Sequence, residues 1–132
     1  MTKCAPRFFP VTLVLLVAAP AAAQDPEAGA RVFTQCRSCH QIGEGARNLV
    51  GPQLNGVIGR HSGQAAGYAY TAANKNSGLT WDEATFREYI KDPKAKIPGT
   101  KMIYAGLKDE KRINDLLAFL KQYDAAGNKV AP

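Results

Sequence analysis

The 132-residue sequence contains only two histidines, two methionines and three cysteines. A zinc site needs four nitrogen, sulfur or oxygen ligands, and His61 is the one histidine besides His40, so few residues could form one. The main apolar run, Val11–Ala19, has nine residues, which is about half of what a membrane-spanning helix requires. No strand pattern, internal repeat or domain linker is visible. A clustered basic stripe with stacking aromatics is also missing, which argues against nucleic-acid binding.

Residues 1–23 have the features of a cleaved secretion signal. Lys3 and Arg7 provide the positively charged start, Val11–Ala19 the apolar centre, and three alanines ending at Ala23 the small-residue cleavage site. The alternative is an uncleaved membrane anchor. The folded domain is expected to begin so soon after this segment that no flexible tether would remain. We therefore favour cleavage and export to the periplasm, with no stable membrane anchor.

The mature chain would be a single domain over residues 24–132. Loss of Lys3 and Arg7 lowers its formal charge from +6 to +4. Cys4 is removed with the signal, which leaves only Cys36 and Cys39. A chain this small has little hydrophobic core of its own, so a large apolar prosthetic group would form a useful part of the interior.

The two remaining cysteines lie in the run Cys36-Arg37-Ser38-Cys39-His40. A Cys-x-x-Cys-His run is typical of covalent haem attachment of the c type. On a helix, Cys39 and His40 lie about 60° and 40° to either side of Cys36, so all three side chains share one face. The two sulfurs can then bond to the vinyl groups on one haem edge while the imidazole reaches the iron.

Three other interpretations of this run are weaker. A redox-active Cys-x-x-Cys is expected at a strand-to-helix junction, and no β-rich stretch precedes Cys36. Zinc lacks the remaining ligands. A disulfide between Cys36 and Cys39 would strain a helix and would leave His40 unexplained.

Helical patterns lie on both sides of this run. Asp25-Pro26 is typical of an N-cap followed by proline at the first helical position, and Thr80 to Glu83 has the spacing of a capping box. Gly29 falls inside the first helix, where glycine costs about 1 kcal/mol relative to alanine, so it indicates either a close helix–helix approach or simple exposure. We expect the first and last helices to pack together. The expected helices cover residues 26–36, 71–76, 80–92 and 109–124, the third ending where Pro93 follows.

Residues 41–70, between the first two of these helices, are rich in glycine. Apolar residues alternate with the glycines, which favours a compact Ω-type loop wrapped around something over a flexible one. Without a ligand, a loop of this length would be hard to stabilise in so small a domain.

A second candidate ligand lies in the turn Ile97-Pro98-Gly99-Thr100-Lys101-Met102. Methionine generally fills cores, but Met102 is the only one besides the initiator, and it stands 62 residues after His40. The proline and glycine fix a turn that could hold its thioether toward the far side of a haem, where a sulfur ligand raises the reduction potential.

Taken together, these motifs make the chain resemble the class I c-type cytochromes, in particular the mitochondrial cytochrome c and bacterial cytochrome c2 group. The similarity extends from about Ala28 to Asp124. Besides the two segments above, it is carried by Trp81 and by the runs Gly51-Pro52-Gln53-Leu54, Gly56-Val57-Ile58-Gly59-Arg60 and Tyr70-Thr71-Ala72-Ala73-Asn74-Lys75-Asn76-Ser77-Gly78. The resemblance implies an all-α small cytochrome c fold, with the N- and C-terminal helices packed together and shorter helices and Ω-loops around one haem c.

The resemblance also implies a role for particular residues. Cys36 and Cys39 would hold the haem covalently, and His40 and Met102 would be the axial iron ligands. The Pro52 carbonyl would orient His40. Tyr70, Trp81 and Thr100 would hydrogen-bond the haem propionates. Arg60 would lie nearby and offset their charge. Tyr89 and Asn74 would lie near the Met102 sulfur.

We therefore expect a soluble, monomeric electron carrier that is not an enzyme. Its partners would be redox proteins: a donor such as a cytochrome bc1 complex, and an acceptor such as a terminal oxidase or a photosynthetic reaction centre. Because protein groups would fill both axial positions, a peroxidase, an oxidase or a gas-binding sensor is disfavoured. The family uses a ring of lysines to meet its partners; Lys94, Lys101 and Lys108 remain here, whereas Gln35, Leu49 and Asp109 stand where lysines are frequent.

Overall fold

The computed structural model describes Met1 and residues 23–130, and in this part of the chain the regular structure is entirely helical. The elements are α1 (Pro26–Phe33), the 3₁₀ turn η1 (Thr34–Cys36), α2 (Ala72–Lys75), α3 (Glu83–Lys91), α4 (Pro93–Lys96) and α5 (Glu110–Lys121). The predicted all-α class is confirmed. No helix among these is long and apolar enough to cross a membrane. The predicted secretion signal lies, apart from its two end residues, outside the described part of the chain.

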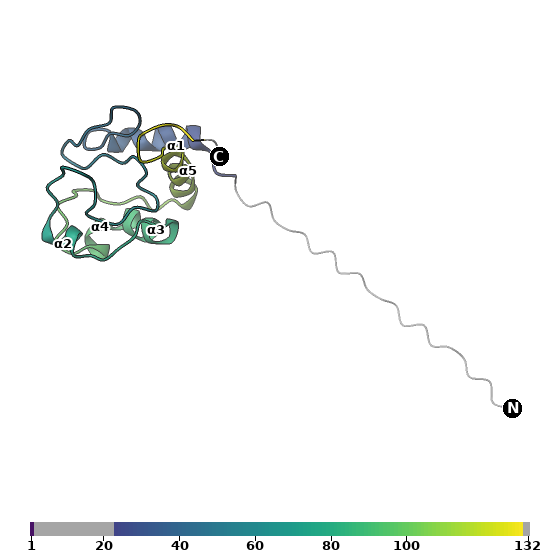
Figure 1. The fold of residues 1–132 in the computed structure, drawn as a ribbon. Coiled ribbons are helices and arrows are strands. Elements are labelled where there is room, and N and C mark those ends of the chain that lie inside the picture. The colour runs from purple at the N-terminus through teal and green to yellow at the C-terminus, as the bar shows by residue number, and fades with distance from the viewer. Residues whose placement is uncertain (2–22, 131–132) are drawn as a thin grey trace.

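α1 and α5 lie against each other although they come from opposite ends of the domain (Figure 1). Asp25 caps α1 as predicted, since its side chain accepts hydrogen bonds from the N–H groups of Glu27 and Ala28. Gly29 is buried against α5: a Cβ built there would lie 1.9 Å from the carbonyl oxygen of Asp115. A close helix approach, and not exposure, therefore explains the glycine.

The hydrophobic core forms where this helix pair meets the loops. Phe33 of α1 is fully buried with Ile113 and Leu117 of α5, and the rings of Phe33 and Phe119 lie 5.2 Å apart. Leu120 belongs to the same apolar stripe of α5 and also lines the large cavity described below. The helix pair therefore supplies one wall of that cavity.

The predicted start of the third helix at Thr80 is wrong. α3 begins at Glu83 and its cap is Asp82, whose side chain accepts a hydrogen bond from the Thr85 N–H. Thr80 instead forms an isolated antiparallel β-bridge with His61. The side chains of the two residues also meet, with Thr80 Oγ1 lying 2.9 Å from His61 Nδ1. Aspartate caps a helix at least as well as threonine, and the pairing with His61 removes Thr80 from the capping position.

The structure also contains one helix that was not expected, and the first and last helices end earlier than predicted, α1 at Phe33 with the 3₁₀ turn η1 continuing to Cys36. Pro93 follows the end of α3 as predicted, but it also starts α4, because its fixed φ and missing N–H suit the first turn of a helix. Asp92 caps this additional helix through the Ala95 N–H. α5 ends at Lys121 rather than at Asp124, since Tyr123 turns away into a bridge with Lys129.

The glycine-rich stretch of residues 41–70 contains no helix and forms the predicted compact loop region. Asn55 is buried and joins two parts of this region. Its side chain accepts a hydrogen bond from the Gly43 N–H at 2.7 Å and donates one to the Gly43 carbonyl at 3.0 Å. Further along, the Tyr68 hydroxyl donates to the Val50 carbonyl at 2.6 Å. Specific side-chain bonds to the backbone thus replace the missing helical hydrogen bonds.

Asp115 is a buried carboxylate at the α1–α5 contact, with 2% of its surface exposed. Its Oδ1 accepts from the Asp25 N–H at 3.0 Å and its Oδ2 accepts from Lys111 Nζ at 2.7 Å. The hydrogen bond from Lys111 is the main reason that the pKa of Asp115 is lowered, and it outweighs the opposing effect of burial. This carboxylate ties the residue before α1 to α5.

The variant Gly29→Ala tests the close approach of the two helices. At an open helical position this change would stabilise a protein by about 1 kcal/mol. Here the added methyl group must displace the backbone of α5, so we expect the free energy of unfolding to fall by about 1–3 kcal/mol in chemical denaturation. Arg31→Ala, on the exposed side of the same helix, is the control and should change that free energy by less than about 0.5 kcal/mol. A more stable Gly29→Ala protein would refute the packing argument.

The variant Asp115→Asn tests the buried carboxylate. Because the pKa of Asp115 is lowered in the folded protein, its ionised form stabilises the native state above the unfolded-chain pKa of about 3.9. That contribution is lost as the pH falls through the lower folded-state value. We expect the variant to lose about 1–2 kcal/mol of unfolding free energy at neutral pH, and the gap to wild type to narrow in acid. Denaturation curves over a pH series measure this, with the exposed-loop change Glu44→Gln as control; a gap that is independent of pH contradicts the assignment.

Candidate functional site

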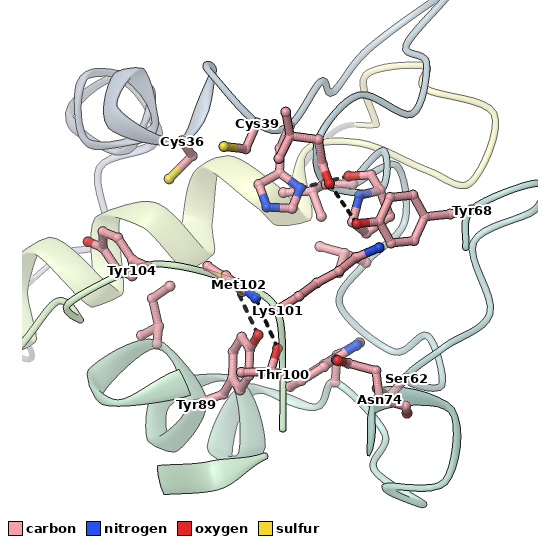
Figure 2. A pocket seen from close by; sticks show the side chains of 18 of the residues that line it. Cys36, Cys39, Ser62, Tyr68, Asn74, Tyr89, Thr100, Lys101, Met102 and Tyr104 are labelled. Carbon is pink, nitrogen blue, oxygen red and sulfur yellow. Dashed lines mark hydrogen bonds between the residues drawn. The ribbon is translucent and has the colours of Figure 1, made fainter. Parts of the chain in front are cut away.

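A cavity of about 310 Å³ opens between the turn that follows α1 and the segment that follows α4. Cys36 and Cys39 lie on one side of it, and Met102, Tyr89 and Thr100 lie on the other (Figure 2). The structure brings every residue predicted for the site into this one lining: Cys36, Cys39, His40, Pro52, Arg60, Tyr70, Asn74, Trp81, Tyr89, Thr100 and Met102.

Cys36 and Cys39 are free thiols on a single turn at the end of α1 and η1. The N–H groups of Cys39 and His40 donate to the Cys36 carbonyl at 3.1 and 2.9 Å. The run therefore keeps the shared face expected of a helix, although it tightens into 3₁₀ and turn geometry. Burial raises the pKa of Cys36 to about 11, with a smaller contribution from Cys39. Half-buried and facing the cavity, the two thiols are placed to bond to a group inside it.

The loop that follows His40 orients its imidazole ring through a hydrogen bond. Its Nδ1 lies 2.7 Å from the Pro52 carbonyl oxygen, so Nδ1 carries the donated proton and Nε2 remains free as an acceptor. Burial lowers the pKa of His40, against the opposing effect of the Pro52 hydrogen bond, which favours the neutral imidazole that binds metals. Gly51 permits this packing, because a Cβ there would lie 2.3 Å from His40 Cε1.

Met102 reaches the cavity from the opposite side and is also held by neighbours. The Tyr89 hydroxyl donates to Met102 Sδ at 3.1 Å, and the Met102 N–H donates to Thr100 Oγ1 at 3.3 Å. Burial raises the pKa of Tyr89, which keeps the phenol protonated and able to donate. The hydroxyl orients the thioether and occupies one of its lone pairs, so that the other stays available to a ligand.

Arg60 leaves one buried donor in the lining without a partner. Its Nη1 and Nη2 donate to the carbonyls of Asn55 and Gln53 at 3.1 and 3.0 Å, but Nε has no acceptor among the described residues. A buried, unpaired N–H of a cation is costly, and a carboxylate such as a haem propionate would satisfy it. The Tyr70 hydroxyl accepts from the Ala65 N–H at 3.1 Å, which leaves its own proton to donate to the same kind of group.

The remaining predicted residues lie in the lining with partners of their own. The Trp81 ring is 4.7 Å from the Tyr89 ring. Asn74 accepts from the Thr71 hydroxyl at 2.9 Å through its side chain. The Thr100 hydroxyl oxygen accepts the hydrogen bond from the Met102 N–H described above. The predicted contacts of Thr100 and Trp81 with the haem propionates stay predictions.

Sequence reasoning missed two contacts at the solvent edge of the cavity. Lys101 Nζ donates to the Ala69 carbonyl at 2.6 Å and lies 4.7 Å from the centre of the Tyr68 ring. The Tyr104 hydroxyl donates to Gln35 Oε1 at 3.2 Å. These bonds join positions that are 32 and 69 residues apart, so no local pattern could have revealed them.

The donor set fits a haem better than a lone metal ion. Within residues 23–130, no group of three or more histidine, cysteine, aspartate or glutamate side chains could hold a metal. One neutral imidazole, one thioether, two thiols and an unpaired arginine N–H instead line a single cavity. The imidazole and the thioether suit the iron of one covalently bound haem, and the two thiols suit the vinyl groups at its edge. The arginine N–H suits a propionate.

Comparison with known proteins supports this interpretation. The chain matches the family model described as cytochrome c over residues 26–124. It is 65% identical over 111 residues to cytochrome c2 of Blastochloris viridis, covering 84% of this chain and 87% of that protein. Cytochrome c-550 of Bradyrhizobium diazoefficiens is 64% identical over 100 residues, covering 76% of this chain and 74% of that protein. The solved structure of cytochrome cH from Methylobacterium extorquens superposes with a TM-score of 0.70 at 45% identity, covering 74% of this chain and 98% of that chain.

The matched range contains the complete attachment run and the Met102 turn. Cys36 and Cys39 therefore bind one haem c covalently, and the zinc, redox-disulfide and structural-disulfide interpretations are excluded. The protein carries electrons and is not an enzyme. With the family model extending from the start of α1 to beyond the end of α5, the chain belongs to the cytochrome c family.

Proposed function

We propose that the protein is a soluble, periplasmic carrier of single electrons whose haem iron is bound by His40 and Met102. The observation that carries this proposal is that these are the one histidine and the one methionine in the cavity lining, and that each is oriented by a hydrogen bond from or to a neighbour. When bound, the haem supplies one-electron exchange between ferric and ferrous iron. Residues 1–23 would direct export and be removed, leaving residues 24–132 as the mature domain.

The surrounding side chains would keep the site nearly unchanged between the two oxidation states. The Pro52 carbonyl fixes the His40 ring, and Tyr89 fixes the Met102 thioether. With His40 and Met102 both bound to the iron, no position would remain at which a substrate could coordinate. Arg60 would offset propionate charge inside the lining, where an unpaired carboxylate would be costly. Little reorganisation is then needed when the charge of the site changes by one unit.

We also propose a docking surface for redox partners at the open edge of the cavity. Val50 and Ile103 line the cavity yet are 73% and 93% exposed. Lys94, Lys101 and Lys108 are exposed on the segments that lead to and from Met102. An exposed apolar pair in the same lining as Lys101, with Lys94 and Lys108 exposed on the adjoining segments, suits a small, transient contact with an acidic protein surface. The partners would be a donor such as a cytochrome bc1 complex and an acceptor such as a terminal oxidase or a photosynthetic reaction centre, met by a monomer.

Replacement of Met102 and of Tyr89 tests the proposed ligation. Met102→Ala should lower the reduction potential, because the sulfur ligand that favours ferrous iron is lost, and should admit carbon monoxide to the iron. Tyr89→Phe keeps the ring but removes the hydrogen bond to sulfur. We expect that hydrogen bond to stabilise the ferrous state over the ferric state by about 1 kcal/mol. Its loss would then lower the reduction potential by about 40 mV for one electron, and carbon monoxide should still not bind. Spectroelectrochemistry and carbon monoxide titration measure both effects.

Tyr104→Phe is the matched control for Tyr89→Phe. It removes a hydroxyl at the edge of the same cavity that bonds to Gln35 and not to Met102, so the potential should change much less. If Met102→Ala kept both the wild-type potential and its resistance to carbon monoxide, another residue would have to occupy the sixth position.

Charge reversal at Lys94 tests the docking surface. Exposed charges are screened over about 10 Å at 0.1 M salt, so the second-order rate of electron transfer to an acidic redox protein should fall as salt rises. Lys94→Glu should lower that rate severalfold at low salt while leaving the visible spectrum unchanged. Lys101 is left intact because it bonds to Ala69 and contacts Tyr68. The absence of lysine at 35, 49 and 109 predicts a shallower salt dependence than in a full lysine ring.

Lys129→Glu is the control for this experiment. It makes the same change in charge on the C-terminal segment, where Lys129 lies over the Tyr123 ring and away in sequence from the segments that lead to and from Met102, so its effect on the rate should be small. A rate that is flat across ionic strength, with Lys94→Glu silent, would show that docking is mainly apolar and would direct the next substitutions to Leu49, Val50 and Ile103.

A further inference from the structure

The segment that follows Met102 runs along the open edge of the cavity with little support from the backbone. Ile103 is exposed, and the next fixed point is Leu107, whose N–H donates to the Ile90 carbonyl at 2.8 Å. Within the described part of the chain, the backbone groups of residues 103–106 form no hydrogen bond with other backbone groups. A segment of this kind opens locally at a lower free-energy cost than a helix in the core.

Tyr104 gives this segment its one hydrogen bond to a distant part of the described chain. Its hydroxyl donates to Gln35 Oε1 at 3.2 Å, and Gln35 lies in η1 next to Cys36. Both side chains line the cavity, and Tyr104 follows Met102 on the same segment (Figure 2). The bond therefore joins the segment of the proposed sulfur ligand to the turn that binds the haem covalently.

We propose that the hydrogen bond between Tyr104 and Gln35 is a clasp that keeps the Met102 segment closed over the haem edge and limits how often Met102 leaves the iron. This inference rests on the proposed ligation by Met102. In the closed arrangement the Tyr89 hydroxyl holds the thioether toward the cavity. Loss of the clasp would make opening more frequent and would leave the closed arrangement of Met102 and Tyr89 as it is.

The size of the effect follows from the surroundings of the bond. The Tyr104 ring packs against the hydrophobic core, and that contact remains when only the hydroxyl is lost. Gln35 is exposed, so water satisfies its amide once the clasp is broken. A neutral hydrogen bond of this kind changes an equilibrium by about two- to fivefold. The clasp thus adjusts the rate of opening and does not decide whether the domain folds.

The rate at which imidazole displaces Met102 from the ferric holoprotein tests the proposal. Imidazole donates a nitrogen lone pair to the iron only after the sulfur has left with its own pair, so at high imidazole concentration the observed rate approaches the rate of opening. Tyr104→Phe and Gln35→Leu should each raise this limiting rate about two- to fivefold, measured by stopped-flow loss of the far-red sulfur-to-iron absorption. The reduction potential should change much less, because it reports the closed state that predominates in every variant.

Three further variants separate the clasp from a general loosening of the cavity edge. Gln35→Glu keeps an acceptor oxygen and should stay near the wild-type rate. Combining Tyr104→Phe with Gln35→Leu should give no further increase, since the same bond is lost in each single variant. Tyr68→Phe is the matched control: it removes a hydroxyl from the same lining that bonds to the Val50 carbonyl, and it should leave the limiting rate unchanged.

Amide hydrogen exchange provides a readout that does not depend on the binding of an added ligand. The Met102 N–H is hydrogen-bonded within the segment and should exchange about two- to fivefold faster in Tyr104→Phe and in Gln35→Leu. The Leu54 N–H is hydrogen-bonded in the loop region and should exchange at the wild-type rate in both variants.

The possible results separate this inference from the function on which it rests. Wild-type limiting rates in both Tyr104→Phe and Gln35→Leu overturn the clasp and leave the electron-carrier function standing. A Gln35→Glu protein as fast as Gln35→Leu, or additive effects in the double variant, also overturns it, because the shape of the side chains and not the bond would then be the cause. A wild-type protein without the far-red absorption would refute ligation by Met102 and, with it, this inference.

Discussion

α1 and α5 approach so closely at Gly29 that no side chain fits between them. This contact determines where the end of α1 lies, and with it the turn that carries Cys36 and Cys39. The same face of α5 continues through Leu116 and Leu120 into the wall of the haem cavity. Because close-packed interiors transmit displacement, a shift of α1 on α5 would move the attachment turn relative to the cavity. The helix contact is thus a condition for the geometry of the site.

The proposed iron ligands illustrate how a small domain makes a rigid site from loops. Neither His40 nor Met102 lies within a helix. Each is instead oriented by a group from another segment, the Pro52 carbonyl for the imidazole and the Tyr89 hydroxyl for the thioether. Such supporting contacts fix the direction of the donor atoms. They also bring together the loop region, α3 and the Met102 turn, so a haem bound between these residues would be part of the core.

Polar groups inside the domain are paired almost throughout the described residues, which makes the exception informative. Asn55 is buried and hydrogen-bonds both the N–H and the carbonyl of Gly43, and both carboxylate oxygens of buried Asp115 accept hydrogen bonds. Arg60 Nε is the one buried side-chain atom in residues 23–130 that lacks a partner. Since buried donors are normally satisfied, this unpaired N–H is the observation on which the proposed contact between Arg60 and a haem propionate rests.

Local sequence determined the attachment run, the helical class, the Asp25 cap and the candidate ligands, because each depends on spacing within a few residues. It did not determine which of two capping residues starts α3: Thr80 and Asp82 are both suitable, and only the bridge between Thr80 and His61 decides. The ambiguity at Gly29 was likewise resolved only by the approach of α5. The bonds of Lys101 with Ala69 and of Tyr104 with Gln35 carry no local pattern at all, since they join distant segments. Short-range preferences can be read along the chain, whereas these contacts exist only once the tertiary fold has brought their partners together.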